Sequence, residues 1–472
     1  MYKLAIKQFL NLNENENAVT TAPALDEQWY DILEKYGSFQ IYEFFESDLN
    51  NASQQKRLFD QNVLLNPKPK YPFLQKRKLQ IFKVGLNKLK KQIRKAENNS
   101  LIKQVYIDKI NEKLIEIKLL EAALNLSHSR NKNEENKFAR QFKIYSQQIY
   151  GKPSKKLFYF AVTKVRRITE KNLNNNGYTQ LVGNKLLEIL PGGDKNKMND
   201  ILKKTDVEKF IAKYLMLDDI LKELHLPKKN IVLDAKKIKK YFEILLDKLN
   251  IDDWEVKITN KGSAINVDHD KEQILIPKKR KLNRDKLRLL MVHEIGVHVR
   301  RRVNGENKAL KILGLGLNNY ETAEEGLAGI CEDLVKKAHD ITFGALLSYL
   351  AIGLVYGLDG KKRDFRDLYE ILVKIYQFKY VLHFDESSTI NWQEIDEKAK
   401  DRAWQKCRRI FRGTNCRVKG VCFTKDIIYL KGRIQIWKQI TNDDPEIMRI
   451  FSAKYDPINA EHIKVLDKLG VA

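Results

Sequence analysis

The sequence predicts an α+β fold, mainly helical, with a small sheet and an N-terminal helical region. Apolar residues recur at alternating steps of three and four over much of the chain, as on one face of a helix. Two short strand-like stretches lie close together near the middle. The 472 residues are 43% hydrophobic and 31% charged, a globular composition with enough length for two structural regions.

The first predicted region, residues 1–149, is helical and basic. Apolar positions at helical spacing mark a helical hairpin, which turns at residues 98–100: Leu79, Phe82, Leu86, Leu89, Ile93, Ile107, Ile110, Leu114 and Ile117. The other face of its first helix is basic: Lys76, Arg77, Lys78, Lys83, Lys88, Lys90, Lys91, Arg94 and Lys95. This face could grip an acidic partner, or it could be an ordinary solvated helix surface.

Residues 150–472 form the second predicted region. Turn residues at 150–154 open it, and helical patterns follow as far as Pro191. The next predicted elements are an amphipathic helix, two strands and a second helix, at Lys236–Leu249, Trp254–Thr259, Gln273–Ile276 and Arg284–His293.

The C-terminal part is again predicted to be largely helical. Its longest apolar run, Phe343–Leu358, contains three glycines and is shorter than the roughly 18 to 20 residues that span a bilayer. We therefore expect a buried helix there and no membrane association. Amphipathic helices are expected at Asp364–Phe378 and Trp392–Phe411, and a short strand or extended segment at Val421–Leu430.

Charge and cysteine content limit the environment and the partners. The net charge of +26 favours anionic partners, although lysine-rich composition can also produce a merely solvated surface. Four cysteines without a C-x-x-C pair argue against a disulfide framework and a cysteine-based zinc ribbon. Because Met1–Asn17 also lacks the features of a secretory signal, we expect a cytoplasmic protein.

The segment HEIGVH places His293 and His298 around Glu294, and Glu325 follows in ETAEEGLAG. Two imidazoles and one carboxylate form a three-ligand site with an open fourth position, as a catalytic zinc ion requires. Zinc lowers the pKa of a bound water to about 7, so a neighbouring glutamate can take its proton, and Glu294 is the natural candidate. Glu324 competes with Glu325 for the third ligand position.

The spacing of the two histidines differs from the familiar HExxH. In a regular helix, five residues advance about 500°, which leaves the side chains about 140° apart. His293 and His298 could not then face one metal ion. A π-bulge brings positions five apart close to one face, and Gly296 makes such a distortion easier. The sequence therefore predicts a widened turn or break between the two histidines.

The remaining histidines are weaker candidates. A second metal site is conceivable at His269 in NVDHD, but a turn is the better interpretation. The others are expected to be surface or core residues: His128, His225, His339, His383 and His462.

Several motifs carry a family resemblance. HEIGVHVRRRVNG, AEEGLAG, FRG and CFTKDIIYLKG together resemble the family named for its QEGLA motif, identified in bacteria as flavohemoglobin expression-modulating proteins. That family includes the microtubule-associated tyrosine carboxypeptidases, which remove the terminal tyrosine from α-tubulin. The resemblance covers roughly Tyr150 to the C-terminus. Glu324 replaces the glutamine of QEGLA, so the glutamate of the motif aligns with Glu325.

The resemblance implies a zincin-like metallopeptidase domain at residues 150–472, with HExxxH as a variant of the usual motif. A helix, a sheet edge and a histidine-bearing helix are the usual frame of such a site. His293, His298 and Glu325 would then be zinc ligands and Glu294 the catalytic base.

A carboxypeptidase also needs a cation for the terminal carboxylate of its substrate, ideally an arginine that donates two parallel hydrogen bonds. Arg300 and Arg412 are the preferred candidates, although Arg301 and Arg409 are also available. Tyr429 could stabilise the oxyanion, or it could be a core aromatic residue of a strand.

Two functional hypotheses follow. The first is a zinc-dependent peptidase, a carboxypeptidase in particular, that acts on a peptide or protein substrate such as an acidic C-terminal tail. The second is a basic regulator that binds nucleic acid or protein and has a structural or vestigial metal site. Nucleic acid is possible as a partner but is not the favoured one.

Overall fold

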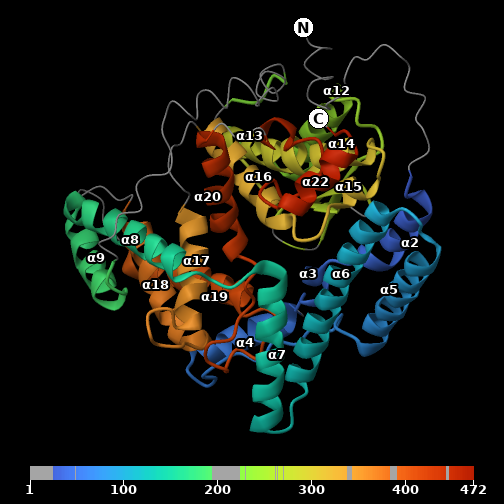
Figure 1. Cartoon of the computed structure of the whole chain (residues 1–472). Coiled ribbons are helices and arrows are strands. Elements are labelled where there is room, and N and C mark those ends of the chain that lie inside the picture. Colours follow the sequence, from blue (N-terminus) through green and yellow to red (C-terminus); the bar gives the residue numbers. More distant parts are fainter. Residues whose placement is uncertain are drawn as a thin grey trace.

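In a computed structural model of the chain, the described residues are 25–47, 49–193, 224–228, 230–260, 262, 264–268, 271–336, 343–382, 391–442 and 446–471. The predicted turn at His269, the histidines His339 and His383, and the segment Met1–Asn17 lie outside them. The described chain is mainly helical and contains one small sheet (Figure 1). This confirms the predicted mainly helical α+β class.

The N-terminal region is helical, as predicted. Its helices are α2 (Glu27–Gly37), α3 (Ile41–Phe44), α4 (Leu49–Asp60), α5 (Lys76–Ala96), α6 (Ser100–Ser127) and α7 (Lys132–Tyr150). Helices α5 and α6 form the predicted hairpin, and Asn99 begins α6 by accepting hydrogen bonds from the backbone N–H groups of Leu101 and Ile102. Leu86, Leu89 and Ile93 of α5 are completely buried, so the apolar spacing identified the packed face correctly.

A second helical group lies on the other side of the molecule (Figure 1). It consists of α8 (Lys155–Lys171), α9 (Gly177–Ile189), α17 (Phe343–Tyr356), α18 (Phe365–Val381) and α19 (Trp392–Ile410), with a short 3₁₀ turn at Leu173–Asn175. From Ala345 onwards every residue of α17 is buried, which confirms the predicted buried helix. Within the described chain, none of the helices combines the length and the apolarity needed to cross a membrane.

The sheet has three strands, β1 (Glu255–Thr259), β2 (Asn266–Asp268) and β3 (Gln273–Pro277), and follows α12 (Ala235–Lys248). The central strand β3 pairs in parallel with β1 and antiparallel with β2. The sequence predicted α12, β1 and β3. It missed β2, because three residues among turn formers give no readable alternation.

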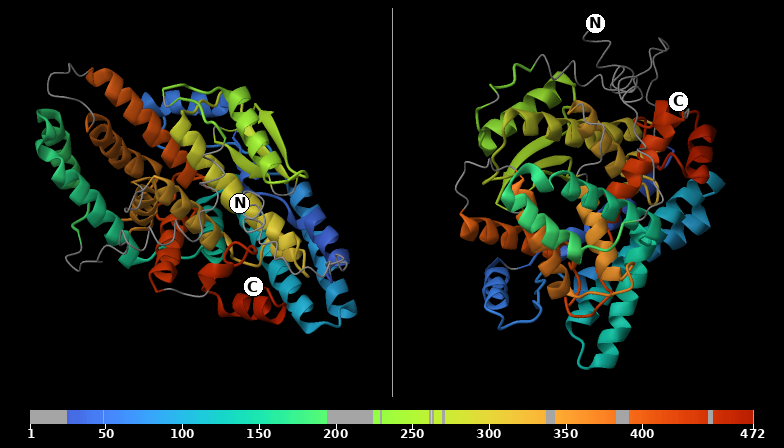
Figure 2. Two further views of the ribbon diagram at one scale, coloured as in Figure 1. Left: turned by 90° about the horizontal axis from the view of Figure 1, so that it is seen from above. Right: turned by 90° about the vertical axis from the view of Figure 1, so that its left-hand side faces the viewer.

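The remaining helices include the two that contain HEIGVH and others of the C-terminal half. They are α13 (Arg284–His293), the π-helical turn η2 (Glu294–Val299), α14 (Arg300–Glu306), α15 (Ile312–Leu315), α16 (Glu321–Val335), α20 (Ile427–Thr441), α21 (Glu446–Arg449) and α22 (Ala460–Lys468). The end-on and side views show α12 and the sheet packed beside the α13 to α16 group (Figure 2).

A strand or extended segment was predicted at Val421–Leu430, and the strand is wrong. Residues 421–424 have no regular structure, and α20 begins at Ile427. The run of Ile427, Ile428 and Leu430 resembles a strand because all three are apolar. In the structure they are buried because α20 is packed on several sides.

Helices α16 and α20 cross at two glycines. A Cβ atom at Gly326 would lie 2.3 Å from the backbone of Gly432, and one at Gly432 would lie 1.9 Å from the carbonyl oxygen of Thr322. Two backbones approach this closely only when neither residue carries a side chain. The crossing therefore fixes Glu325, the neighbour of Gly326, relative to α20.

Two hydrophobic clusters form the core. One joins the N-terminal helices to α8, α9 and α17 to α19, and the other joins α12 and the sheet to α13, η2 and α16. Helix α20 belongs to both, through Ile428 and Ile434 in the first and Ile436 and Trp437 in the second. The first cluster extends across residue 150, and the division of the chain there stays a prediction.

Candidate metal centre

The two histidines lie on either side of a widened helical turn. His293 is the last residue of α13, and residues Glu294–Val299 form the π-helical turn η2. A π-turn has a wider repeat than an α-helix, so residues five apart approach one face. The two imidazole ring centres lie 4.9 Å apart at an interplanar angle of 71°. The predicted widening between the histidines is confirmed.

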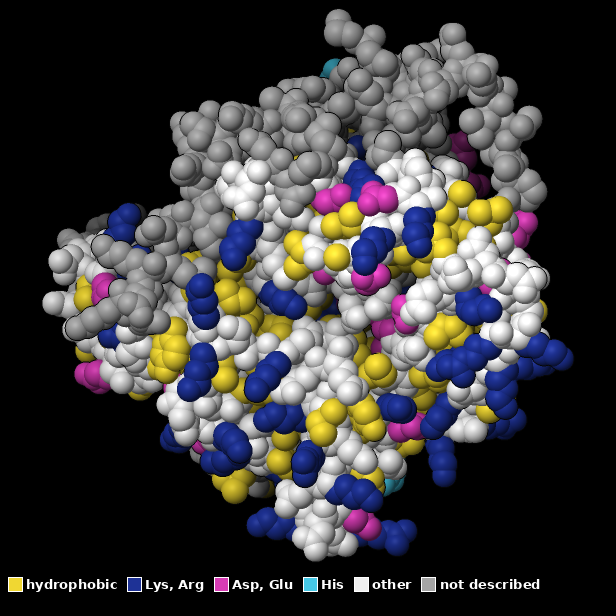
Figure 3. Space-filling model, in the orientation of Figure 1, with side chains coloured by type: hydrophobic (Ala, Val, Ile, Leu, Met, Phe, Trp, Pro, Cys, Tyr) yellow, Lys and Arg dark blue, Asp and Glu magenta, His cyan; other side chains and the backbone are white. Residues whose placement is uncertain are grey.

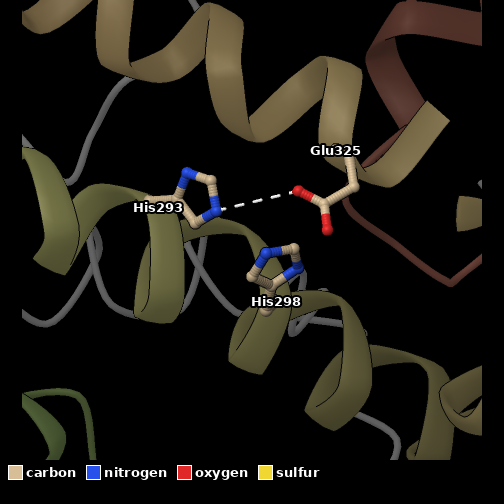
Figure 4. A group of neighbouring side chains, drawn as sticks. All are labelled: His293, His298 and Glu325. Atoms are coloured by element: carbon tan, nitrogen blue, oxygen red, sulfur yellow. Dashed lines mark ion pairs between the residues drawn. The ribbon is translucent and has the colours of Figure 1, made fainter. Parts of the chain in front are cut away.

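Glu325 of α16 reaches the same place. His293, His298 and Glu325 each offer a ligand atom, and these three atoms lie within 4.8 Å of one another (Figure 4). The Nε2 atom of His293 is 3.9 Å from a carboxylate oxygen of Glu325. The ligand set that the sequence suggested is therefore brought together from two separate helical segments.

Each imidazole is held from behind by a second carboxylate. The Nδ1 atom of His293 lies 2.8 Å from Glu332, and that of His298 lies 2.9 Å from Glu324. A carboxylate at Nδ1 fixes the tautomer with hydrogen on Nδ1, so Nε2 carries the lone pair that a metal needs. Glu324, the competitor of Glu325 for the third ligand position, thus contacts the back of His298.

The sequence analysis did not identify Glu332. Its signal was present in the spacing, because Glu325 and Glu332 are seven residues apart and so lie on one face of α16, two turns from each other. Burial would raise the pKa of Glu332, but the hydrogen bond from His293 lowers it to about 2.

The charge state of His293 reflects these neighbours. Burial opposes its protonation, yet the hydrogen bond to Glu332 and the charges of Glu294 and Glu325 raise the pKa of His293 to about 9. A metal ion binds only the neutral imidazole, so metal binding there would release a proton.

Glu294 is buried inside the π-turn, beside both histidines. Burial raises its pKa, and the nearby His293 and His298 oppose that rise. Among the described residues, the Glu294 carboxylate has no hydrogen bond or ion pair. A carboxylate without a fixed partner next to a candidate metal position can accept and release a proton.

The three residues predicted to bind substrate lie in different surroundings. Arg300 is buried, and its guanidinium carbon is 4.0 Å from the centre of the Phe451 ring. Arg412 is partly buried with its guanidinium carbon 5.1 Å from the centre of the Tyr42 ring. Their roles in substrate binding stay predictions.

Tyr429 lies on α20, near the ligand group. It precedes Gly432, which packs on Gly326 beside Glu325, by three residues. Burial raises the pKa of Tyr429, and the charge of Glu325 adds to that rise. Its hydroxyl accepts a hydrogen bond of 3.1 Å from Arg409. Arg409 also donates through Nε to both oxygens of Asp426, at 2.9 and 2.7 Å. Arg409, one of the available arginines, therefore contacts Tyr429 directly.

All four cysteines, Cys331, Cys407, Cys416 and Cys422, are buried free thiols. Burial is the main cause of their raised pKa values. This agrees with the expected absence of a disulfide framework.

Comparisons with known proteins identify a family. The family model described as microtubule-associated tyrosine carboxypeptidase matches residues 197–373 and 391–472, more than half of the chain. The match contains the π-turn, α16 and α20, and it begins later than Tyr150, where the sequence resemblance was placed. Neither the curated proteins nor the solved structures include a match to the chain. The chain belongs to the microtubule-associated tyrosine carboxypeptidase family.

Proposed function

We propose that this protein is a zinc-dependent carboxypeptidase. The observation that carries the proposal is the convergence of His293, His298 and Glu325 within 4.8 Å, on segments inside the family match. The family name supports a carboxypeptidase, and the donor set supports zinc. We also propose that the α13 to α16 group, with its small sheet, is a zincin-like domain.

The side chains suit a zinc ion. Two imidazole nitrogens and one carboxylate oxygen are typical donors for catalytic zinc, and in a tetrahedral site such donors lie about 3.3 Å apart. The 3.9 Å separation of His293 Nε2 and Glu325 Oε2 needs only a small adjustment to reach that value. When bound, zinc would act as a Lewis acid that polarises a carbonyl group and lowers the pKa of water to about 7.

Glu294 would perform the proton transfers. Its carboxylate would take a proton from the attacking water and deliver it to the leaving amine. Burial favours this role because it raises the pKa of Glu294 and so brings its protonated form closer to neutral pH.

Arg409 and Tyr429 are the best placed to hold the terminal carboxylate of a substrate. Tyr429 lies three residues before Gly432, which packs on Gly326 beside Glu325. Arg409 is anchored by Asp426 while its side chain remains 44% exposed. Two further cations lie over the ring of Tyr42, with Lys425 Nζ 4.3 Å and the guanidinium carbon of Arg412 5.1 Å from its centre. An arginine fixed by a carboxylate is a preorganised donor for a second carboxylate.

We propose a protein C-terminus as the substrate, with tyrosine as its last residue and an acidic tail before it. The family name supports tyrosine and a microtubule protein. The net charge of +26 supports an acidic tail, since it would attract such a segment. The buried free thiols support the proposed cytoplasmic location.

The test combines metal analysis with peptide digestion. The purified protein should contain about one zinc per chain, and it should release the last residue of peptides with a free C-terminus but not of amidated ones. Glu294→Gln should keep the zinc and lose turnover, because the metal ligands remain while the base is gone. Glu461→Gln, at an exposed site on α22, is the matched control and should stay active.

Two results would overturn this proposal. Full turnover by Glu294→Gln would exclude Glu294 as the base. Full turnover by protein freed of metal with a chelator would exclude a zinc-dependent mechanism. Cleavage of amidated peptides at internal bonds would instead show an endopeptidase.

A basic binding protein remains the second candidate. Its support is the exposed basic face of α5. Arg77, Lys88, Lys91 and Lys95 are exposed there, and their spacings of eleven, three and four residues place them on one side of the helix. Figure 3 shows lysine and arginine side chains gathered over this part of the molecule.

A further inference from the structure

A buried charge network lies directly behind His298. One oxygen of Glu324 accepts a hydrogen bond from His298 Nδ1 at 2.9 Å, and the other accepts one from Arg301 at 2.6 Å. Lys454 Nζ lies 3.6 Å from the oxygen that faces His298. Arg301 and Lys454 are fully buried, and only 3% of Glu324 is exposed.

The network is fixed to the C-terminal segment of the chain. Arg301 donates through Nε to the carbonyl oxygen of Ala453 at 2.8 Å and through Nη2 to that of Tyr455 at 2.7 Å. The backbone of Lys454 pairs with that of Leu313 and Leu317, on α15 and just after it, at 2.8 and 2.9 Å. A guanidinium held at three points cannot rotate away, so it presents Glu324 with a donor in a fixed position.

This geometry requires a carboxylate at position 324. Both oxygens of Glu324 face donors, His298 Nδ1–H on one side and Arg301 on the other. A glutamine side chain has one acceptor oxygen and one NH2 group, so in either orientation it would place hydrogen against hydrogen at one of the two contacts. It would also remove a negative charge that lies against the buried cations Arg301 and Lys454. The glutamine of the QEGLA motif would therefore fit this chain poorly.

We propose that Glu324, braced by Arg301 and Lys454, is a positioning residue that holds His298 for metal binding. The carboxylate keeps the imidazole from rotating, fixes its tautomer and increases the electron density at Nε2. This inference rests on the proposed zinc site and adds a determinant of its affinity.

The experiment measures zinc affinity, not activity. Zinc is titrated into the full chain, freed of metal, in competition with a chromophoric chelator. Glu324→Gln should bind zinc about 10 to 100 times more weakly than the unaltered chain, the range found when a supporting partner of a metal ligand is lost. Asp333→Asn is the matched control, because Asp333 is a buried carboxylate on the same helix. It pairs with Arg433 at 2.6 Å and contacts neither histidine.

A double variant separates positioning from folding. Glu324→Gln combined with Lys454→Met removes one of the two buried cations together with the carboxylate, so it should recover much of the thermal stability lost in Glu324→Gln. Its zinc affinity should stay as low as that of the single variant. If the single variant does not fold, the double variant provides the affinity measurement.

Unchanged zinc affinity in these Glu324 variants would overturn the positioning role, as would an equal loss of affinity in Asp333→Asn. Both outcomes leave the zinc site itself intact. Failure of the unaltered chain to bind zinc would instead refute the proposed function, so the two failures are distinguishable.

Discussion

Two runs of three basic residues occupy opposite environments in this molecule. Lys76, Arg77 and Lys78 begin α5 and are all exposed. Arg300, Arg301 and Arg302 begin α14 and are buried, with 6%, 0% and 1% of each residue exposed. In the sequence the two runs look alike.

The difference lies in what surrounds each helix. Three successive helical residues point in directions about 100° apart, so all three are buried only where the helix has neighbours on most sides. Arg300 packs on Phe451, Arg301 binds the backbone of residues 453–455, and Arg302 contacts Tyr30 and Glu34 of α2. The arginines next to the candidate metal ligands therefore join separate parts of the chain.

The first and largest expected effect is on Arg302. Its guanidinium donates to Tyr30 at 2.8 Å and Glu34 at 3.0 Å, and it pairs with Glu306 at 2.8 Å. Arg302→Met would leave two neighbouring carboxylates without their cation, so we expect a loss of about 3 kcal/mol in the free energy of unfolding. Denaturant titration in the presence of zinc measures it.

Arg77→Met is the matched control for that change. It replaces an exposed arginine at the start of α5 with methionine, as in Arg302→Met. The free energy of unfolding should change by no more than about 0.5 kcal/mol. Equal losses of unfolding free energy in the two variants would show that burial does not make the arginines of α14 more important for stability than those of α5.

The second prediction concerns Arg300. Its guanidinium packs on the ring of Phe451, and burial lowers its pKa. Arg300→Met keeps apolar contact with Phe451 and removes a desolvated charge, so we expect a loss of only about 1 kcal/mol. The same denaturant titration applies, and a loss as large as that of Arg302→Met would contradict the ranking.

The third prediction tests the partner of Arg302 on α2. Glu34 is 31% exposed in its side chain, so water weakens this ion pair and can replace it. Glu34→Gln should reduce the free energy of unfolding by less than about 1 kcal/mol. Repeating the measurement at high salt should shrink the difference, whereas a salt-independent loss would point to a packing role instead.

The smallest effect on stability is expected on the basic face of α5. Changing Arg77, Lys88, Lys91 and Lys95 together to glutamine should leave the thermal midpoint within a few degrees of its original value. The variant should also bind a polyanion such as heparin more weakly, with a shallower dependence on salt. If polyanion binding is unchanged, this face is only a solvated surface, and the second candidate function loses its support.

Local patterns in the sequence predicted much of the fold and the core of the candidate site. The extra residue in HEIGVH requires a widened turn for His293 and His298 to meet, and the π-turn follows from that geometry alone. The spacing of Leu86, Leu89 and Ile93 likewise identified the packed face of α5. Each of these predictions depends on neighbours within one or two helical turns.

What the sequence could not predict depends on how distant segments meet. The spacing places Glu332 on the same face of α16 as Glu325, but the histidine that each of Glu324 and Glu332 contacts depends on the rotation of α16 relative to η2. No local pattern determines that rotation. Ile427 and Ile428 suggested a strand because a helix buried on several sides and a strand have similar apolar content. The burial of Arg302 needed knowledge of α2, far away in the chain.

Because Gly326 and Gly432 pack directly on each other, the segments AEEGLAG and KDIIYLKG depend on each other structurally. A bulkier residue at either position would push α16 away from α20 and carry Glu325 out of reach of the histidines. Natural variants should therefore keep both small residues or exchange them in concert. A chain that has the first segment without the second would be a poor candidate for the same chemistry, however well its histidines align.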